Sequence, residues 1–262
     1  MPLPDLNRGR RKAIRNLATR VCEECWRRHG RTIPVDLEQI AKDANLPVGL
    51  KHDEDRIGWI ENRGGKLRIF LDPELPQTEC RFTLAHELGH FFLPAHWELL
   101  MSGEGVHYPY LPGVLSTLVP EQEANYFASA LLMPDPEFLP RIQENRITLD
   151  LVREFAERFG VSLQAAAIRS VEAASTACAA IVVPSGGSFS PWTVISDALT
   201  KLGVNKTSGL KAGCLHSPTS TGTALGNWFK NVPLSKQTMP FHQDVFRFGD
   251  GGVMVLLREG LY

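Results

Sequence analysis

The sequence predicts an α+β protein in which two unequal folded parts are joined by a helical segment. Hydrophobic residues make up 43% of the 262 residues, enough to bury a sizeable core. Apolar residues recur at helical spacing over most of the chain, and short strand-like runs replace them after Cys178. We therefore expect a first α+β domain at residues 1–140, a helix-turn-helix-like helical segment at 141–175 and a C-terminal α+β domain at 176–262.

Helical spacing begins near the N-terminus. Apolar side chains recur at helical intervals over residues 7–29, and Gly30 follows as a stop. Cys22 and Cys25 fall on this helix, where packing in the core is favoured over a metal or redox site because neither further soft ligands nor a preceding strand accompany them. Asp36 can cap a second, short helix that ends near residue 45.

A hairpin and a long helix are predicted next. The strand-like runs 57–60 and 67–71 are separated by the turn-forming segment Asn-Arg-Gly-Gly. Helical spacing covers 77–92, with Thr78 as the expected cap. Glycines and prolines mark 96–120 as an irregular stretch, which is longer than most connections and therefore typical of an active-site border.

The remaining elements complete the predicted α+β pattern. Helical spacing resumes over 121–133, and Pro134 ends it because proline cannot continue the hydrogen-bond ladder. Two short helices at 149–159 and 163–174 form a pair that resembles a helix-turn-helix. Strand-like runs follow at 179–183 and 253–257.

Charge and hydropathy exclude several function classes. The chain has 28 Lys and Arg against 29 Asp and Glu, a net charge of -1, so direct DNA binding is not expected. No apolar run approaches the roughly 20 residues that span a bilayer, and the N-terminus lacks the apolar core of a signal peptide. The five scattered cysteines do not form a disulfide framework. We therefore expect a cytoplasmic protein with free thiols and no membrane partner.

The segment 86–90 spells H-E-L-G-H. On a helix His86 and His90 project from one face, so their imidazoles can hold one Zn²⁺, although Mn²⁺ and other divalent metals also accept such ligands. Glu87 can take a proton from a metal-activated water and pass it to the leaving amine. Gly89 lowers helix propensity by about 1 kcal/mol relative to alanine, so we expect a neighbouring backbone to approach closely there. The motif favours a metallopeptidase over an amphipathic helix with two surface histidines.

A catalytic zinc site usually has three protein ligands, and two residues compete for the third place. His96 has metzincin spacing, but Leu93 and Pro94 stand where a glycine would allow the required sharp turn. Glu121 begins a segment that looks like the third-ligand helix of gluzincins. Asn125 lies one turn further on, where its amide can orient a ligand. Glu121 is therefore favoured over His96.

Two sequence blocks carry a closer resemblance. The run R-F-T-L-A-H-E-L-G-H at 81–90 and the run E-Q-E-A-N-Y-F-A-S-A-L-L-M-P at 121–134 closely resemble the ImmA/IrrE family of bacterial metallopeptidases. With the hairpin, the resemblance covers roughly residues 10–140. It implies a compact zincin-like domain with Glu121 as the third ligand. Members of this family cut helix-turn-helix (XRE-like) repressors, which releases genes of mobile elements, toxin systems or the DNA damage response.

The order of the predicted domains resembles the IrrE type. It implies a GAF-like sensor at 176–262, although no residue constellation there identifies a ligand. The leading hypothesis is a zinc endopeptidase that binds an extended repressor segment at the edge of the hairpin. We expect His107, Tyr108 or Tyr110 to donate a hydrogen bond to the oxyanion. The alternatives are a regulator that binds a partner without catalysis and a DNA-binding repressor that uses residues 148–174.

Overall fold

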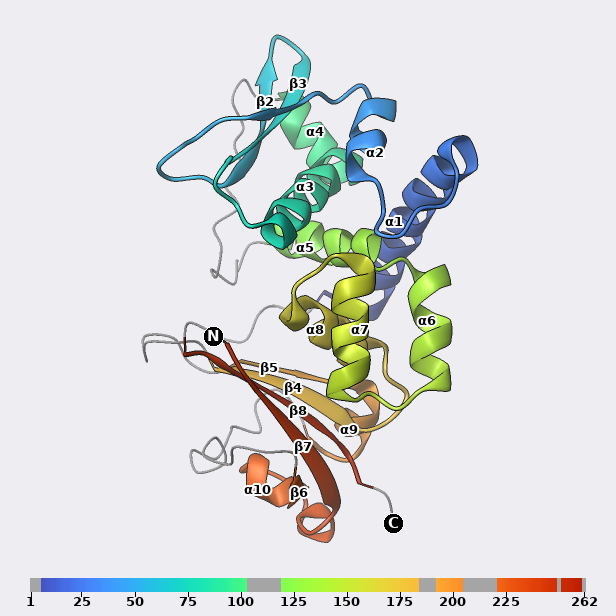
Figure 1. The fold of residues 1–262 in the computed structure, drawn as a ribbon, viewed down its shortest axis with the longest axis vertical. Helices are drawn as coiled ribbons and strands as arrows, with labels where there is room; N and C mark the ends of the chain where they lie inside the picture. The colour runs from blue at the N-terminus through green and yellow to red at the C-terminus, as the bar shows by residue number, and fades with distance from the viewer. Residues whose placement is uncertain (1–5, 103–118, 184–191, 205–220, 249–250, 261–262) are drawn as a thin grey trace. The chain divides into compact units, whose positions relative to one another are not determined.

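The computed structural model describes residues 6–102, 119–183, 192–204, 221–248 and 251–260 (Figure 1). The chain divides into two compact units. The first contains the described residues up to Phe138 together with Glu157–Ser162, and the second contains Leu139–Ala156 and the residues from Leu163 onward. Helices and strands occur in both, so the α+β class is confirmed. The boundaries at 140 and 175 stay predictions about the division of the chain.

The first unit begins with the long helix α1 (Arg8–His29), in agreement with its predicted bounds. The Asn7 side chain caps it by accepting a hydrogen bond from a first-turn amide at 2.8 Å. Gly30 ends it with a φ of 92°, a conformation that favours glycine. Cys22 and Cys25 are buried free thiols on this helix, so the C-x-x-C pair packs in the core.

A short helix and a three-stranded sheet follow. Asp36 caps α2 through the amide of Gln39 at 2.9 Å, as expected. The hairpin forms as predicted, and the left-handed φ values of 58° and 80° at Gly64 and Gly65 make its turn. The sheet order is β1-β3-β2, in which β1 runs parallel to β3 and β2 antiparallel to it. These elements are α2 (Leu37–Asp43), β1 (Val48–Leu50), β2 (Gly58–Arg63) and β3 (Lys66–Leu71).

Helix α3 (Gln77–Phe92) has the predicted bounds, but the expectation that Thr78 caps it is wrong. The helix already begins at Gln77, so Thr78 lies inside its first turn and no side chain caps the end. Instead, the carbonyl of Pro76 accepts hydrogen bonds from two amides of the first turn, at 3.0 and 2.8 Å. The start of α3 is therefore set by the backbone before it rather than by a side chain.

The predicted irregular stretch at 96–120 is wrong over residues 96–102, which lie in helix α4 (Pro94–Ser102), and over 119–120, where the next helix has already begun. Leu93 is extended and its carbonyl accepts hydrogen bonds from the amides of His96 and Trp97, at 3.0 and 2.9 Å. Pro94 stands at the first helical position, where its missing N–H costs nothing. The chain therefore turns at Leu93 and starts a new helix directly.

Helix α5 (Val119–Leu132) packs against both α3 and α1. A Cβ atom at Gly89 would lie 3.2 Å from the Cα and the carbonyl oxygen of Ala124, which is tighter than ordinary van der Waals contact. The close backbone approach expected at Gly89 is therefore present, and α5 is the partner. As predicted, the helix ends shortly before Pro134.

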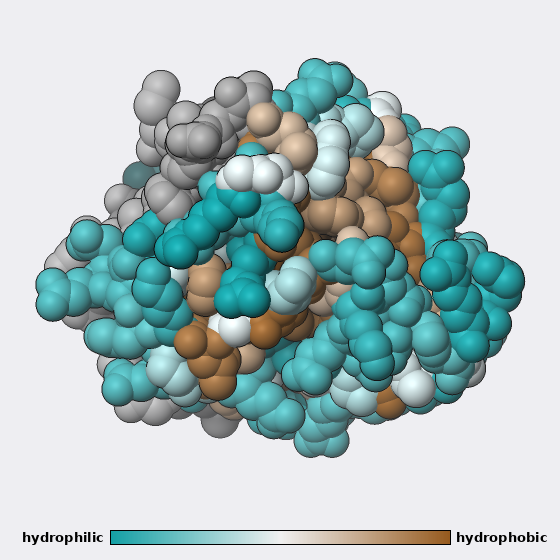
Figure 2. All heavy atoms as spheres, turned by 90° about the horizontal axis from the view of Figure 1, so that it is seen from above, coloured by the Kyte–Doolittle hydropathy of each residue, from teal (hydrophilic) through white to brown (hydrophobic). Residues whose placement is uncertain are grey.

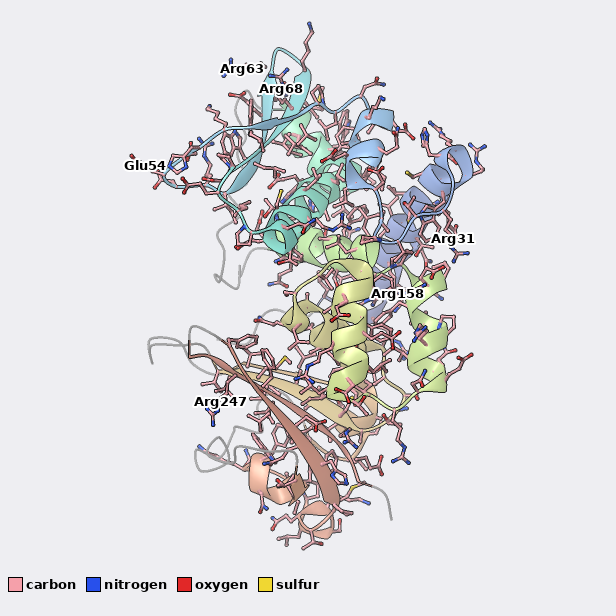
Figure 3. The ribbon with its side chains drawn as sticks, in the orientation of Figure 1. Arg31, Glu54, Arg63, Arg68, Arg158 and Arg247 are labelled. Atoms are coloured by element: carbon pink, nitrogen blue, oxygen red, sulfur yellow. The ribbon has the colours of Figure 1, made fainter. Side chains whose placement is uncertain are left out.

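Helices α6 (Asp135–Glu144) and α7 (Leu149–Phe159) each have residues in both units. Arg31, which follows α1, and Arg158 of α7, both labelled in Figure 3, form ion pairs with Glu137 of α6. Phe138 and Phe159 are buried beside this cluster, with ring centroids 6.1 Å apart. The ion pairs and the aromatic contact therefore join the end of α7 to α6 within the first unit.

The second unit contains a five-stranded antiparallel sheet of order β5-β4-β8-β7-β6. Its apolar core includes Ile181, Leu199, Trp228, Phe241 and Val255, all almost fully buried. The elements are α8 (Leu163–Ala173), β4 (Cys178–Val183), β5 (Trp192–Ile195), α9 (Asp197–Lys201), β6 (Thr221–Ala224), α10 (Leu225–Trp228), the short 3-10 helix Leu234–Lys236, β7 (Pro240–Arg247) and β8 (Val253–Glu259).

The view from above shows apolar side chains gathered between polar ones (Figure 2). In the first unit, a groove of about 920 Å³ lies between α2, β1 and the start of α3. Val48 and Leu50 of β1 are exposed at its side, by 37% and 69%. Among the described helices none is both long enough and apolar enough to cross a membrane.

Candidate metal centre

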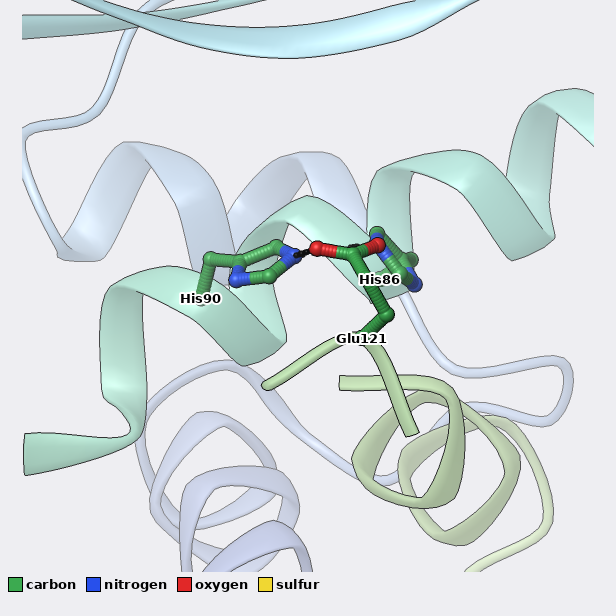
Figure 4. A group of neighbouring side chains, drawn as sticks. All are labelled: His86, His90 and Glu121. Atoms are coloured by element: carbon green, nitrogen blue, oxygen red, sulfur yellow. Dashed lines mark hydrogen bonds and ion pairs between the residues drawn. The ribbon is translucent and has the colours of Figure 1, made fainter. Parts of the chain in front are cut away.

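The two histidines of the H-E-L-G-H segment lie on one face of α3. Both side chains are completely buried, and their Nε2 atoms are 3.0 Å apart (Figure 4). The spacing of four residues places them one turn apart on the helix, so both rings point toward α5. Two imidazole nitrogens therefore face the same point in the interior of the first unit.

Glu121 of α5 reaches the same point from the opposite side. Its Oε2 atom lies 3.2 Å from Nε2 of His86 and its Oε1 atom 3.3 Å from Nε2 of His90 (Figure 4). Ligand atoms of these three residues all lie within 4.8 Å of one another, and the three side chains are buried. The close approach of α5 to Gly89 brings the carboxylate near enough for these contacts.

The donor set fits a divalent metal ion. His86 lies with Nδ1 2.9 Å from Oδ1 of Asn125, and because an amide oxygen only accepts, Nδ1 carries a proton, which leaves Nε2 as the ring atom that can bind a metal. Burial lowers the pKa of His90 to about 4, so its imidazole is neutral at pH 7. Two neutral imidazoles and a carboxylate are the protonation states that zinc ligands need.

The carboxylate of Glu121 is ionised at neutral pH. Burial alone raises its pKa, but the contacts with His86 and His90 outweigh burial and hold the pKa at about 2. Apart from its 3.3 Å contact with Nε2 of His90, Oε1 of Glu121 is buried without a hydrogen-bond partner among the described residues. A negative oxygen in this position is costly unless a cation neutralises it, which again fits a metal ion.

Glu87 is buried beside the three ligand candidates, with 1% of its surface exposed. Burial and the nearby negative charge of Glu121 raise its pKa well above the usual value. Its Oε1 atom has no hydrogen-bond partner. A Cβ atom at Gly58, the first residue of the edge strand β2, would lie 3.6 Å from that oxygen. The carboxyl group of Glu87 therefore lies next to the sheet edge and favours binding a proton.

His96 does not join this group. Its Nδ1 atom lies 3.1 Å from Nδ1 of His90, on the opposite side of the His90 ring from Glu121. Its Nε2 atom lies 3.1 Å from Oε2 of Glu123, which in turn accepts two hydrogen bonds from Arg10. Of the two residues that compete for the third ligand position, the structure thus brings Glu121 to the histidine pair and places His96 behind it.

Some expected site residues cannot be placed, and others were not expected. His107, Tyr108 and Tyr110, proposed to bind the oxyanion, lie outside the described residues. Reasoning from the sequence missed Glu123 as a partner of His96 and missed Arg10 altogether. Arg10 and Glu123 are 113 positions apart, and no local pattern signals such a pair. The only hint is that Glu123 follows Glu121 on the same helix.

Comparisons with known proteins found a family and a solved structure that resemble this chain. Residues 41–102 and 114–170 match the model of the peptidase M78 family, described as the IrrE N-terminal-like domain. Among solved structures, the chain resembles one described as a Mycobacterium tuberculosis transcriptional regulator, with 13% identity and a TM-score of 0.59. The match covers 95% of this chain and 76% of the other, and at this identity it concerns the fold alone. Among curated proteins none matches.

Proposed function

Because the chain belongs to the IrrE-like peptidase M78 family, we propose that it is a zinc-dependent endopeptidase with His86, His90 and Glu121 as metal ligands and Glu87 as the general base. One observation carries the proposal. The ligand atoms of three buried residues from two helices converge, and an unpartnered carboxylate lies next to them. Such a convergence needs the helix contact at Gly89, which a chance H-E-x-x-H segment on a surface helix does not have.

When bound, zinc supplies a Lewis acid that lowers the pKa of water to about 7 and polarises the scissile carbonyl. Glu87 takes the proton of the attacking water on its carboxylate and delivers it to the nitrogen of the leaving amine. Burial and the negative charge of Glu121 raise the pKa of Glu87, so its carboxylate holds a proton more firmly than an exposed glutamate would. Burial of the group excludes bulk water from this exchange.

The edge of β2 is the proposed binding site for the peptide. In the described sheet β2 pairs on one side only, with β3, so an added strand would pair along its other edge, where Gly58, Trp59 and Ile60 are buried in this structure. Gly58 brings this edge next to Glu87. An extended peptide paired with β2 would therefore pass the general base, as a peptidase requires.

The proposed substrate is a helix-turn-helix (XRE-like) repressor, whose cleavage would release stress-response, DNA damage or mobile-element genes. The resemblance to the ImmA/IrrE family supports this, and so does the regulatory role in the name of the similar Mycobacterium tuberculosis protein. In this proposal the second unit is a GAF-like sensor that controls cleavage, and the protein acts in the cytoplasm, where repressors are found.

A second reading is a DNA-binding regulator, which the name of the similar structure favours. The geometry gives it less support. Arg169, the basic residue of α8, is 1% exposed and therefore cannot reach phosphates or base edges. A third reading, a regulator that binds a partner without cutting it, gives no chemical reason for the buried carboxylate of Glu87.

The proposal is tested with purified zinc-loaded protein and the helix-turn-helix regulators encoded beside it. Wild type should cut one regulator, whereas Glu87→Gln should bind zinc normally and cut it about 10²- to 10⁴-fold more slowly, the usual contribution of a general base. Glu98→Gln, the same change at an exposed position of α4, serves as the control. If wild type and Glu87→Gln bind a regulator equally and neither cuts it, the protein is a binding regulator. Salt-dependent binding to DNA would instead support the second reading.

A further inference from the structure

We infer that His96, Glu123 and Arg10 are positioning residues that determine which ring nitrogen of His90 is presented to the metal. The inference rests on the proposed function, because it concerns a proposed ligand. The three residues form one line of contacts that starts at His90 and ends at α1. His90 Nδ1 lies 3.1 Å from His96 Nδ1, His96 Nε2 lies 3.1 Å from Glu123 Oε2, and Arg10 contacts both oxygens of Glu123 at 2.6 and 2.5 Å.

The direction of these hydrogen bonds follows from Arg10, the residue farthest from His90. A guanidinium group has only donors, so Glu123 accepts from Arg10 with both carboxylate oxygens. An ionised Glu123 can only accept from His96 as well, which places the His96 proton on Nε2. Nδ1 of neutral His96 then carries a lone pair.

The direction of the hydrogen bond between His90 and His96 follows in the same way, because one of its two nitrogens must donate and the other must accept. Because His96 accepts at Nδ1, His90 must donate from its own Nδ1, and Nε2 of His90 is then the ring atom that can bind a metal. That atom is the one 3.0 Å from Nε2 of His86 and 3.3 Å from Glu121. An arginine on α1 therefore selects, through two intervening side chains, the tautomer in which His90 can bind a metal.

Burial makes this selection effective. His90, His96 and Glu123 are exposed by 0%, 1% and 6%, so water does not compete for their hydrogen bonds. Only Arg10 reaches solvent, with 37% of its side chain exposed. The other histidine has a different support, the neutral amide of Asn125. His86 is therefore oriented by a neutral amide, whereas His90 is oriented through an ion pair.

Arg10 also lies outside the residues that match the family model, which begin at residue 41. The ionic end of the line is thus supplied by a helix of this chain that the matched segment does not contain. Since α1 packs on α5, the same helix that carries Glu121 and Glu123, its packing and the tautomer of His90 are coupled.

The first experiment reads the tautomer directly in the metal-free protein. Nitrogen-15 NMR of the histidine rings distinguishes a proton on Nδ1 from one on Nε2. His90 of wild type should carry its proton on Nδ1 and His96 on Nε2. In Glu123→Gln both rings should become mixtures of the two tautomers. A His90 of wild type that carries its proton on Nε2 overturns the inference, whether or not the protein binds zinc.

The second experiment measures zinc affinity by competition with a chelator, with zinc alone as the probe. The zinc affinity of Glu123→Gln should be about 10- to 100-fold lower than that of wild type, which is the usual effect of removing a hydrogen-bond partner of a metal ligand. Arg10→Gln should lose less, and Arg10→Lys, which keeps the charge, should recover part of that loss. Arg15→Gln is the matched control, because Arg15 also lies on α1 and pairs with the carboxylate of Asp135 at 3.1 Å without touching a histidine.

The two proposals fail differently. If wild type binds zinc and Glu123→Gln binds it equally well with unchanged histidine spectra, the positioning role is wrong and the proposed function stands. If wild type shows the expected tautomers but binds no zinc, the positioning role of the line is supported and the proposed function is wrong. Circular dichroism identifies variants that do not fold, and for these the wild-type spectrum and Arg10→Gln decide.

Discussion

Nδ1 of His86 and Oδ1 of Asn125 lie 2.9 Å apart although 39 positions separate them in the sequence. The contact joins α3 to α5 at the point where Glu121, one turn before Asn125, meets the same histidine. One helix therefore supplies both a candidate metal ligand and the group that orients another. The site therefore depends on how α5 lies against α3.

Replacing Asn125 should weaken metal binding without removing a ligand. Asn125→Ala deletes the acceptor of the His86 Nδ1 proton, so zinc affinity should fall about 10-fold or more. Asn125→Asp keeps an oxygen acceptor at the same place and should retain most of the affinity. Chelator competition measures both. Equal losses in the two variants would mean that Asn125 acts through packing rather than by accepting this hydrogen bond.

Gly89→Ala should destabilise the first unit despite better helix propensity. The gain in propensity is about 1 kcal/mol, whereas forcing a methyl group into a packed interface costs about 1–3 kcal/mol. The new Cβ would press on the Ala124 backbone at 3.2 Å and move Glu121 outward, so zinc affinity should also fall.

Urea unfolding of Gly89→Ala and of Gly9→Ala measures the first effect. Gly9 lies on α1, where a Cβ atom would meet only Asn7 Oδ1 at an ordinary 3.4 Å. The Gly9→Ala variant should therefore be no less stable than wild type. A stabilised Gly89→Ala would show that α5 can move away from α3 at little cost.

Gly58→Ala should destabilise the first unit and displace Glu87, because the new methyl group would clash with α3. Its Cβ would lie 2.1 Å from Cγ2 of Thr83, so either β2 or α3 must shift, and Glu87 lies one turn further along α3. Thr83→Ser removes the clashing methyl group. The double variant should therefore recover stability, as measured by thermal unfolding, and recover cleavage if that is detected. If the double variant is as unstable as Gly58→Ala, the loss of stability comes from a changed conformation of β2 and not from the contact with Thr83.

The Arg10–Glu123 contact predicts a pH dependence of stability. Burial raises the pKa of Glu123, but the hydrogen bonds from Arg10 outweigh burial and lower it. A carboxylate with a lowered folded-state pKa stabilises the protein above its unfolded pKa, about 4.3, and loses this contribution as the pH falls through the folded value. Wild type should therefore have a higher free energy of unfolding than Arg10→Gln at pH 7, and this difference should become smaller below about pH 4. Urea unfolding at pH 7 and pH 3 measures it, and an equal difference at both would contradict the pairing.

The predictable parts of the site are those with local signals. Helical periodicity and the H-E-L-G-H spacing place His86, Glu87 and His90 on one turn of α3, because helix geometry alone determines which positions share a face. Gly89 even signals the close approach of another helix. The separate segment with Glu121 and Asn125 required the resemblance to a family, since spacing alone left His96 as a competitor.

The parts that could not be predicted depend on contacts between distant segments. Helix α4 was missed because Pro94 indicates a break, whereas the extended Leu93 lets it start a new helix. The same turn carries His96 to the far side of His90 rather than to the ligand position. The ion pair of Arg10 and Glu123 has no local signal, because it depends on α1 packing across α5.

Metal analysis of the purified protein tests the central proposal most directly. Wild type and the control Glu98→Gln, which changes an exposed carboxylate of α4, should each hold about one zinc ion per chain, and Glu121→Gln should hold almost none. All three should show the same circular dichroism. If wild type and Glu121→Gln hold equal zinc, Glu121 is not the third ligand, and if wild type holds no divalent metal, the chain is not a metallopeptidase.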